Sequence, residues 1–269
     1  MEIFAAPTVQ ALLAGLLSWL SITLGAAIIF LRRQFSRRAM DIMLGMAGGM
    51  MLGAAFWSLL TPSIEMSKDL GKLSFGPPLL GLLLGAAFLR GLDKVLPHLH
   101  ALSGTTEGPS TTWRRSVLLV TAMALHHIPE GLAMGVGYGA ADAAATFGGA
   151  DAVTFSTAVV LTVSILLQNL PEGLVVSTAL RAEGFSSRRA CFYGMLSGIT
   201  APLGAVPGAL AAGATAHVLP VALAFAAGAM LYVVVEEVIP EANASGNGNE
   251  ATLACIGGVA LVLCLSALL

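Results

Sequence analysis

Long apolar runs, separated by short charged or turn-forming stretches, divide the chain into eight segments. Each segment has about the length of a helix that crosses a bilayer, roughly 20 residues, and none alternates in the manner of a β-barrel strand. The pattern predicts an all-α integral membrane protein with eight transmembrane helices in a single domain over residues 1–269. The expected spans are 9–31, 40–62, 77–96, 115–139, 152–180, 187–213, 216–239 and 251–268.

Composition agrees with a membrane environment. Hydrophobic residues make up 57% of the chain and charged residues 10%, whereas a soluble domain carries roughly 25% charged residues. The first apolar run follows Glu2 and no basic residue, which predicts a retained helix rather than a cleaved signal peptide. Three scattered cysteines indicate neither a disulfide framework nor a thiolate metal site. We expect the lipid bilayer, and no nucleic acid, as the partner surface.

The basic residues predict an orientation. Eleven of the thirteen Lys and Arg residues fall in alternate loops, and only Lys68 and Lys72 fall in the others. The positive-inside rule then places the first set in the cytoplasm and both termini on the extracytoplasmic side. The longest cytoplasmic connection, 97–113, is rich in Gly, Ser and Thr, and we expect it to be flexible. The eleven residues are Arg32, Arg33, Arg37, Arg38, Arg90, Lys94, Arg114, Arg115, Arg181, Arg188 and Arg189.

Internal similarity links two oppositely directed spans. Gly49, Met51 and Leu52 of span 2 match three residues of span 7 at a constant offset, and a proline ends both segments. The matching residues are Gly228, Met230 and Leu231. Such similarity is typical of inverted-repeat transporters, whose binding site lies near the midplane of the membrane. It predicts a 3+2+3 arrangement, in which spans 1–3 are related to spans 6–8 and spans 4 and 5 lie between them.

Polar residues recur in register in the most apolar part of the chain. The stretch "HHIPEG" (126–131) in span 4 is matched by "QNLPEG" (168–173) in span 5. Residues three and four apart share a helix face, so each glutamate can serve two neighbouring positions. The first position would be lined by His126, Glu130, Gln168 and Glu172, and the second by His127, Glu130, Asn169 and Glu172. Spacing therefore predicts a site for one divalent ion, or for two with bridging carboxylates.

The two glutamates favour a cation. An ionised carboxylate at the bilayer centre costs roughly 2.5–3.5 kcal/mol on insertion scales, and no Lys or Arg lies at that depth to pair with it. Imidazole with carboxylate and amide oxygens suits Zn²⁺, Fe²⁺, Mn²⁺ or Co²⁺, whereas the lack of thiolate disfavours Cu⁺. Pro129 and Pro171 each remove a backbone donor, and Gly131 and Gly173 allow close helix approach.

At these residues the chain resembles the bacterial branch of the ZIP family of divalent metal transporters. The resemblance rests on "HHIPEG", "QNLPEG", "YGMLSG" (193–198) and "GAMLYVVVEEVIPE" (228–241). It implies uptake of Zn²⁺, and of ions such as Cd²⁺, through a binuclear centre between spans 4 and 5. It also implies a homodimer in the bacterial inner membrane, no enzymatic activity and no organic cofactor. Spans 1, 4, 5 and 6 would slide as an elevator against the rest.

The resemblance also implies roles for individual residues. Met51 would be an extra ligand of the first position, Glu237 an accessory acidic residue, and Asp41 and Glu236 part of the transport pathway. Ala201 stands where relatives often have a glutamate before the proline, and His127 and Asn169 stand where relatives can have Asn and Asp. We therefore predict that the first position carries transport and that the second is weakened or modulatory.

Other functions stay open at this stage. A proton-coupled carrier of an organic solute would use the glutamates as proton relays, and a passive channel would have the same spans. An intramembrane metalloenzyme would need a general base and an HExxH-type motif, which the sequence lacks.

Overall fold

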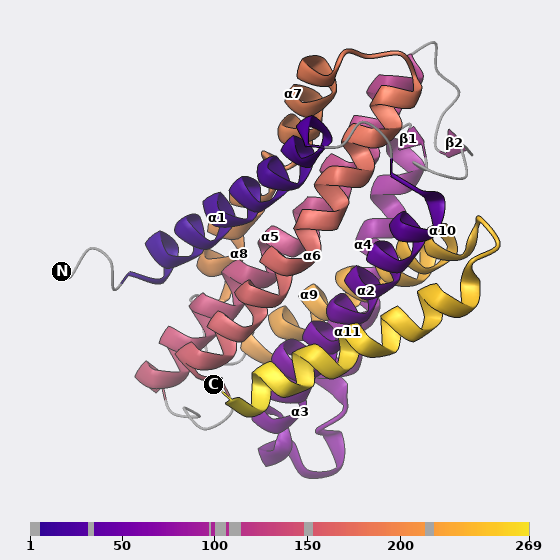
Figure 1. Cartoon of the computed structure of the whole chain (residues 1–269). Coiled ribbons are helices and arrows are strands. Elements are labelled where there is room, and N and C mark those ends of the chain that lie inside the picture. Colours follow the sequence, from indigo (N-terminus) through magenta and orange to yellow (C-terminus); the bar gives the residue numbers. More distant parts are fainter. Residues whose placement is uncertain are drawn as a thin grey trace.

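The computed structural model is a bundle of long helices that describes residues 6–31, 35–96, 98–99, 106–107, 114–147, 153–212 and 218–268 (Figure 1). The first half contains α1 (Pro7–Ala27), η2 (Ile28–Phe30), α2 (Arg37–Gly53), η3 (Ala54–Leu60), α3 (Thr61–Met66), η4 (Lys68–Leu73) and α4 (Gly76–Val95). The second half contains α5 (Arg115–Phe147), α6 (Phe155–Ala182), α7 (Ser187–Ser197), α8 (Thr200–Ala212), α9 (Leu219–Val233), η5 (Val234–Val238), α10 (Ile239–Asn243) and α11 (Gly248–Leu268).

The predicted spans all coincide with helices. Within the described residues, seven continuous helical stretches are long and apolar enough to cross a membrane. The eighth, α4, falls outside that group, and its last turns carry Arg90, Asp93 and Lys94. Large side chains such as Leu203, Leu210 and Leu253 are more than 60% exposed, as expected for a surface that faces lipid. The all-helical membrane architecture is therefore confirmed.

Local sequence signals determine where several helices begin. The side chains of Ser36, Thr154 and Ser186 accept hydrogen bonds from the backbone N–H three residues later and cap α2, α6 and α7. A proline in the first turn, where no donor is needed, opens α1, α4 and α9. These starts lie within a few residues of the predicted ones.

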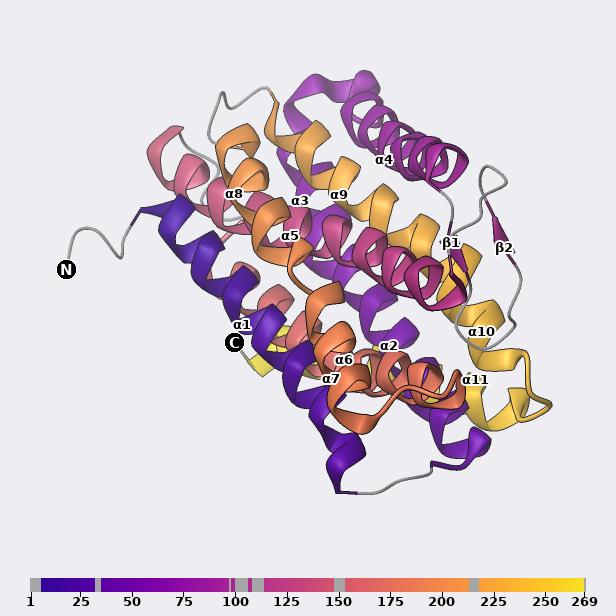
Figure 2. The ribbon, with the colours of Figure 1, turned by 90° about the horizontal axis from the view of Figure 1, so that it is seen from above.

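Helices distant in sequence pack as four close pairs. The pairs are α1 with α6, α5 with α8, α2 with α11, and α4 with α9. Figure 2 shows α1 and α4 on opposite sides of the bundle, with α5 between them. Glycines make each contact close: a Cβ on Gly173 would meet the Ile22 carbonyl of α1, and one on Gly131 would meet the Ala201 carbonyl of α8. The predicted role of these two glycines is confirmed.

The sixth predicted span, 187–213, is broken into α7 and α8. Pro202 has no N–H to donate back to Gly198, and the turn at 198–199 separates the two helices. The amide of Ala201 bonds to the Gly198 carbonyl at 3.1 Å instead of the Ser197 carbonyl. The Ser197 carbonyl is thus left available for another donor.

Two other helices each widen into a π-helical segment just before a proline. α2 continues into the π-helix η3 before Pro62, and α9 continues into the π-helix η5 before Pro240. Such widened turns occur mainly at functional sites. By contrast, α5 and α6 pass through Pro129 and Pro171 as single helices.

The ends of the bundle differ. The start of α1 and the end of α11 lie toward the end that carries α3, whereas α7, α10 and the short strands β1 (His98–Leu99) and β2 (Thr106–Glu107) lie at the other (Figure 1). The strands pair antiparallel inside the predicted flexible loop. Most of that loop lies outside the described residues, as do Arg32 and Arg33. Its predicted flexibility stays a prediction.

Candidate metal centre

Helices α5 and α6, which contain Pro129 and Pro171, bring the predicted polar residues together inside the bundle. Glu130, His127, Gln168 and Asn169 have no exposed surface, and His126 and Glu172 are at most 3% exposed. Three ligand atoms, one each from His126, Glu130 and Glu172, lie within 4.8 Å of one another. A divalent ion bound at about 2 Å from each such atom requires this kind of convergence.

The first predicted position lies around His126. Its Nε2 atom is 3.9 Å from Glu172 Oε1, and its Nδ1 atom is 3.5 Å from Glu237 Oε2 of η5. Gln168 donates a hydrogen bond from Nε2 to Glu130 Oε1 at 2.8 Å. This bond holds the Glu130 carboxylate and leaves Gln168 Oε1 directed elsewhere. Residues of α5, α6 and η5 therefore meet at one point.

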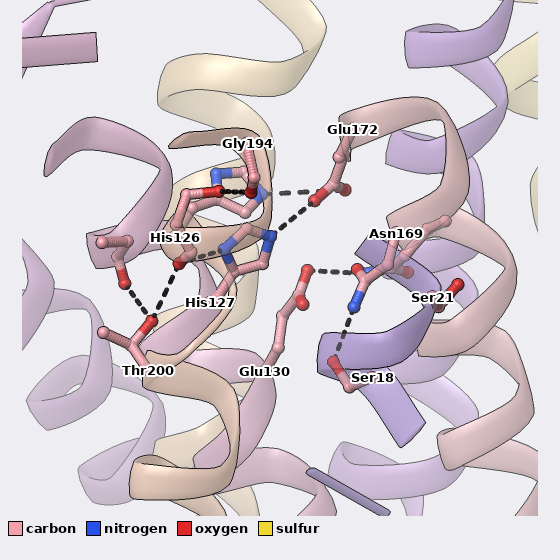
Figure 3. Close-up of polar contacts among 12 residues, drawn as sticks. Ser18, Ser21, His126, His127, Glu130, Asn169, Glu172, Gly194 and Thr200 are labelled. Atoms are coloured by element: carbon pink, nitrogen blue, oxygen red, sulfur yellow. Dashed lines mark hydrogen bonds and ion pairs between the residues drawn. The ribbon is translucent and has the colours of Figure 1, made fainter. Parts of the chain in front are cut away.

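The second predicted position is organised by the break between α7 and α8. His127 Nδ1 lies 3.0 Å from the freed Ser197 carbonyl, and because a carbonyl can only accept, Nδ1 carries the hydrogen. In neutral His127 the Nε2 atom is then the one with a lone pair, and it faces Glu172 Oε2 at 3.5 Å (Figure 3). The chain thus fixes the tautomer that a metal ligand requires.

Helix α1 completes this second position. Asn169 donates from Nδ2 to Ser18 Oγ at 2.7 Å, as Figure 3 shows, so its Oδ1 atom is free to accept. Ser18 is fully buried, and the sequence analysis did not include it. Its hydroxyl lies in the middle of an apolar span, with Ser21 one turn later, but serines are common in such spans and the local sequence does not single it out.

Many lone pairs in the site have no hydrogen-bond donor. Among the described residues of the site, eight buried atoms accept or donate no hydrogen bond: His126 Nδ1 and Nε2, His127 Nε2, Glu130 Oε2, Gln168 Oε1, Asn169 Oδ1 and both carboxylate oxygens of Glu172. Buried polar atoms are normally paired, and an orphaned one costs about 1–3 kcal/mol. Among the described residues, the ion pairs at the site join glutamates to histidines, and none of them includes a Lys or Arg. Both facts suit a bound cation.

The remaining predicted residues lie at different places. Glu237 reaches His126, as described above. Met51 is fully buried in the main hydrophobic core together with Met230, so its role as a ligand stays a prediction. Glu236 is partly buried beside Glu237 on η5. Asp41 lies ten residues before Met51 on α2, about 15 Å along the helix, and accepts a hydrogen bond from Asn247 at 2.8 Å.

Comparison with known proteins gives consistent matches. A family model described as "ZIP Zinc transporter" matches residues 105–266. Zinc transporter ZIP11 of Homo sapiens is 37% identical, over 95% of this chain and 96% of the relative. Zinc transporter GufA of Myxococcus xanthus is 39% identical over 94% and 96%, and zinc transporter ZupT of Escherichia fergusonii is 31% identical over 95% and 94%. The matches include vertebrate as well as bacterial proteins, so they do not single out the bacterial branch.

Proposed function

Because the chain belongs to the ZIP family of zinc transporters, we propose that it carries Zn²⁺ and related divalent cations into the cytoplasm. One observation carries this proposal: ligand atoms of His126, Glu130 and Glu172 converge within 4.8 Å inside an apolar bundle, among eight imidazole, carboxylate and amide atoms that have no hydrogen bond. This ligand set suits Zn²⁺, Cd²⁺, Fe²⁺, Mn²⁺ and Co²⁺. The metal is the transported substrate, and the residues around it need only to bind it, strip its water and release it.

The proposed orientation has both termini outside the cytoplasm, in the inner membrane of a bacterium. The excess of Lys and Arg in alternate loops supports it. The connection after α10 holds no basic residue, yet Arg38 pairs with Glu250 at 3.0 Å and Arg37 donates to Ser245 at 3.0 Å. This connection and the first turn of α11, which carries Glu250, therefore lie beside basic residues of the predicted cytoplasmic side, which is compatible with the proposed orientation.

We propose the 3+2+3 inverted repeat for the helices. The four close pairs fit it. The repeat exchanges spans 1–3 with spans 6–8, and span 4 with span 5. Under this exchange the α1–α6 pair becomes the α8–α5 pair, and the α2–α11 pair becomes the α9–α4 pair. The π-helices fit it as well, since η3 and η5 occupy matching places before Pro62 and Pro240. A chance similarity between two apolar segments would not be expected to reproduce both features.

An elevator movement is the proposed mechanism. Helices α1, α5, α6 and α8 pack mainly on one another, and α2, α4, α9 and α11 form the other pairs. Glu237 approaches the site from the second group, so a slide of the first group would carry His126 away from it. The homodimer is proposed on the family resemblance. Structures of the protein in a bilayer, with and without metal, would contradict the slide if both groups kept one relative position.

Uptake of radioactive metal into proteoliposomes tests the transport function. We expect saturable ⁶⁵Zn²⁺ uptake that an excess of unlabelled Cd²⁺ reduces and an excess of Mg²⁺ does not, because Mg²⁺ retains its water and disfavours imidazole. Liposomes without protein are the control. Linear, non-saturating uptake would indicate a channel, and transport of a solute without any metal would indicate the proton-coupled carrier.

The two metal positions are expected to contribute unequally. We predict that His126→Ala lowers the initial uptake rate about a hundredfold, whereas Asn169→Ala lowers it less than tenfold. The reason is that Asn169 offers one neutral oxygen and is already engaged by Ser18, whereas His126 lies between two carboxylates. Initial rates at equal amounts of reconstituted protein measure this. An equal loss in the two variants would contradict the ranking.

A further inference from the structure

A cavity whose lining includes none of the predicted metal ligands lies between the first turns of α5 and α7. It has a volume of about 390 Å³ and opens at the end of the bundle that carries α7. Arg114, just before α5, and Arg189, in the first turn of α7, both line it. Ser116 and Tyr193 add hydroxyl groups to the same wall. The metal-transport mechanism uses none of these residues.

The two arginines bring uncompensated charge to this cavity. Within the described residues, neither Arg114 nor Arg189 takes part in an ion pair, whereas Arg38 pairs with Glu250. The first turns of α5 and α7 contain no acidic residue, and helix N-termini carry partial positive charge. The two arginines that line the cavity and the two helix N-termini therefore favour an anion, and paired arginine side chains suit a phosphate group.

Apart from Thr121, the remaining walls of the cavity are apolar. Val117 and Val120 of α5 and Leu196 of α7 line it below the arginines. Val117 is 45% exposed and Leu196 is 36% exposed, on helices that cross the membrane. A free phosphate ion would gain nothing from these walls, but an anionic phospholipid has a phosphate for the arginines and acyl chains for the apolar groove.

We propose that the cavity between α5 and α7 binds one anionic phospholipid, with its phosphate between Arg114 and Arg189 and an acyl chain along Val117, Val120 and Leu196. Tyr193, which is 37% exposed and packs edge-to-face against Phe185 with ring centroids 5.7 Å apart, lies at the level where aromatic side chains favour the lipid interface. Basic pockets between membrane helices on the cytoplasmic side are suited to such headgroups.

Native mass spectrometry of the purified, delipidated protein tests the proposal. The protein is titrated with dioleoyl phosphatidylglycerol, with dioleoyl phosphatidylcholine, and with inorganic phosphate as competitor. We expect one phosphatidylglycerol molecule to bind more tightly than phosphatidylcholine or inorganic phosphate. The double substitution Arg114→Gln with Arg189→Gln should weaken this binding about tenfold. The matched control is Lys94→Gln with Arg188→Gln, which removes the same charge from two exposed residues outside the cavity.

The outcomes separate the possibilities. Loss of the tight phosphatidylglycerol in the cavity variant, with retention in the control, supports the site. An equal loss in both variants would mean general charge attraction at the membrane surface and would overturn it. Displacement of the lipid by an equal concentration of inorganic phosphate would make the ligand a free anion and would overturn the lipid assignment. An unchanged melting temperature of the cavity variant shows that its folding is intact.

Discussion

Replacing Glu130 by Gln is expected to reduce saturable Zn²⁺ uptake about a hundredfold or more. The glutamate faces both predicted metal positions, and Gln keeps its volume and can still accept the hydrogen bond of Gln168 through its amide oxygen. What disappears is one negative charge in a site where no Lys or Arg of the described residues pairs with the carboxylates. Loss of residues that merely support a metal ligand already costs 10–100-fold in affinity or activity, so loss of a shared charged ligand should cost at least as much.

Uptake into proteoliposomes and Zn²⁺ binding to the purified protein measure this effect independently. The control is Glu65→Gln, which removes an exposed carboxylate that pairs with Lys68 at 2.9 Å near the end proposed to be extracytoplasmic. An exposed pair of this kind contributes little, and we expect nearly unchanged uptake. If Glu130→Gln retained tight Zn²⁺ binding and normal uptake, the carboxylate would not be a ligand, and the proposed site would be wrong.

The sequence predicted the spans and the site for the same physical reason. Burial of polar groups in lipid is so costly that the pattern of apolar runs and the few polar exceptions to it both carry information. The six predicted ligand residues of the two motifs lie buried together in the structure, and Glu237 lies beside them. Their spacing was enough because i,i+3 and i,i+4 positions must share a helix face.

Other features depend on contacts between distant segments and could not be read from local spacing. No local pattern indicated that the break after Ser197 would free a carbonyl for His127, because that bond joins two residues on different helices, 70 positions apart in the chain. The bond between Ser18 and Asn169 spans 151 residues. Serines are common in membrane helices and usually bond to their own backbone, as Ser164 does here. Only the packing of α1 against α6 distinguishes Ser18 from them.

Replacing Gly131 by Ala is expected to destabilise the bundle by about 3 kcal/mol. A Cβ atom at this position would lie 2.9 Å from the carbonyl carbon of Ala201 and closer still to its oxygen. Because the obstacle is helix backbone rather than the end of a flexible side chain, α5 and α8 must move apart, and overpacking of this kind costs about 1–3 kcal/mol or more. A drop of about 5 °C or more in melting temperature in detergent would follow.

The matched control is Gly257→Ala on α11, where an added Cβ would meet nothing within 4 Å. Alanine favours the helix by up to about 1 kcal/mol over glycine, so this variant should melt at the same temperature or higher. A second effect separates the two variants, because a displaced α8 also shifts the adjoining end of α7, whose last residue, Ser197, offers its carbonyl to His127. Gly131→Ala alone should therefore weaken Zn²⁺ binding. Equal stability of the two variants would mean that α5 and α8 do not touch at Gly131, and the helix pairing that builds the metal centre would then have to be revised.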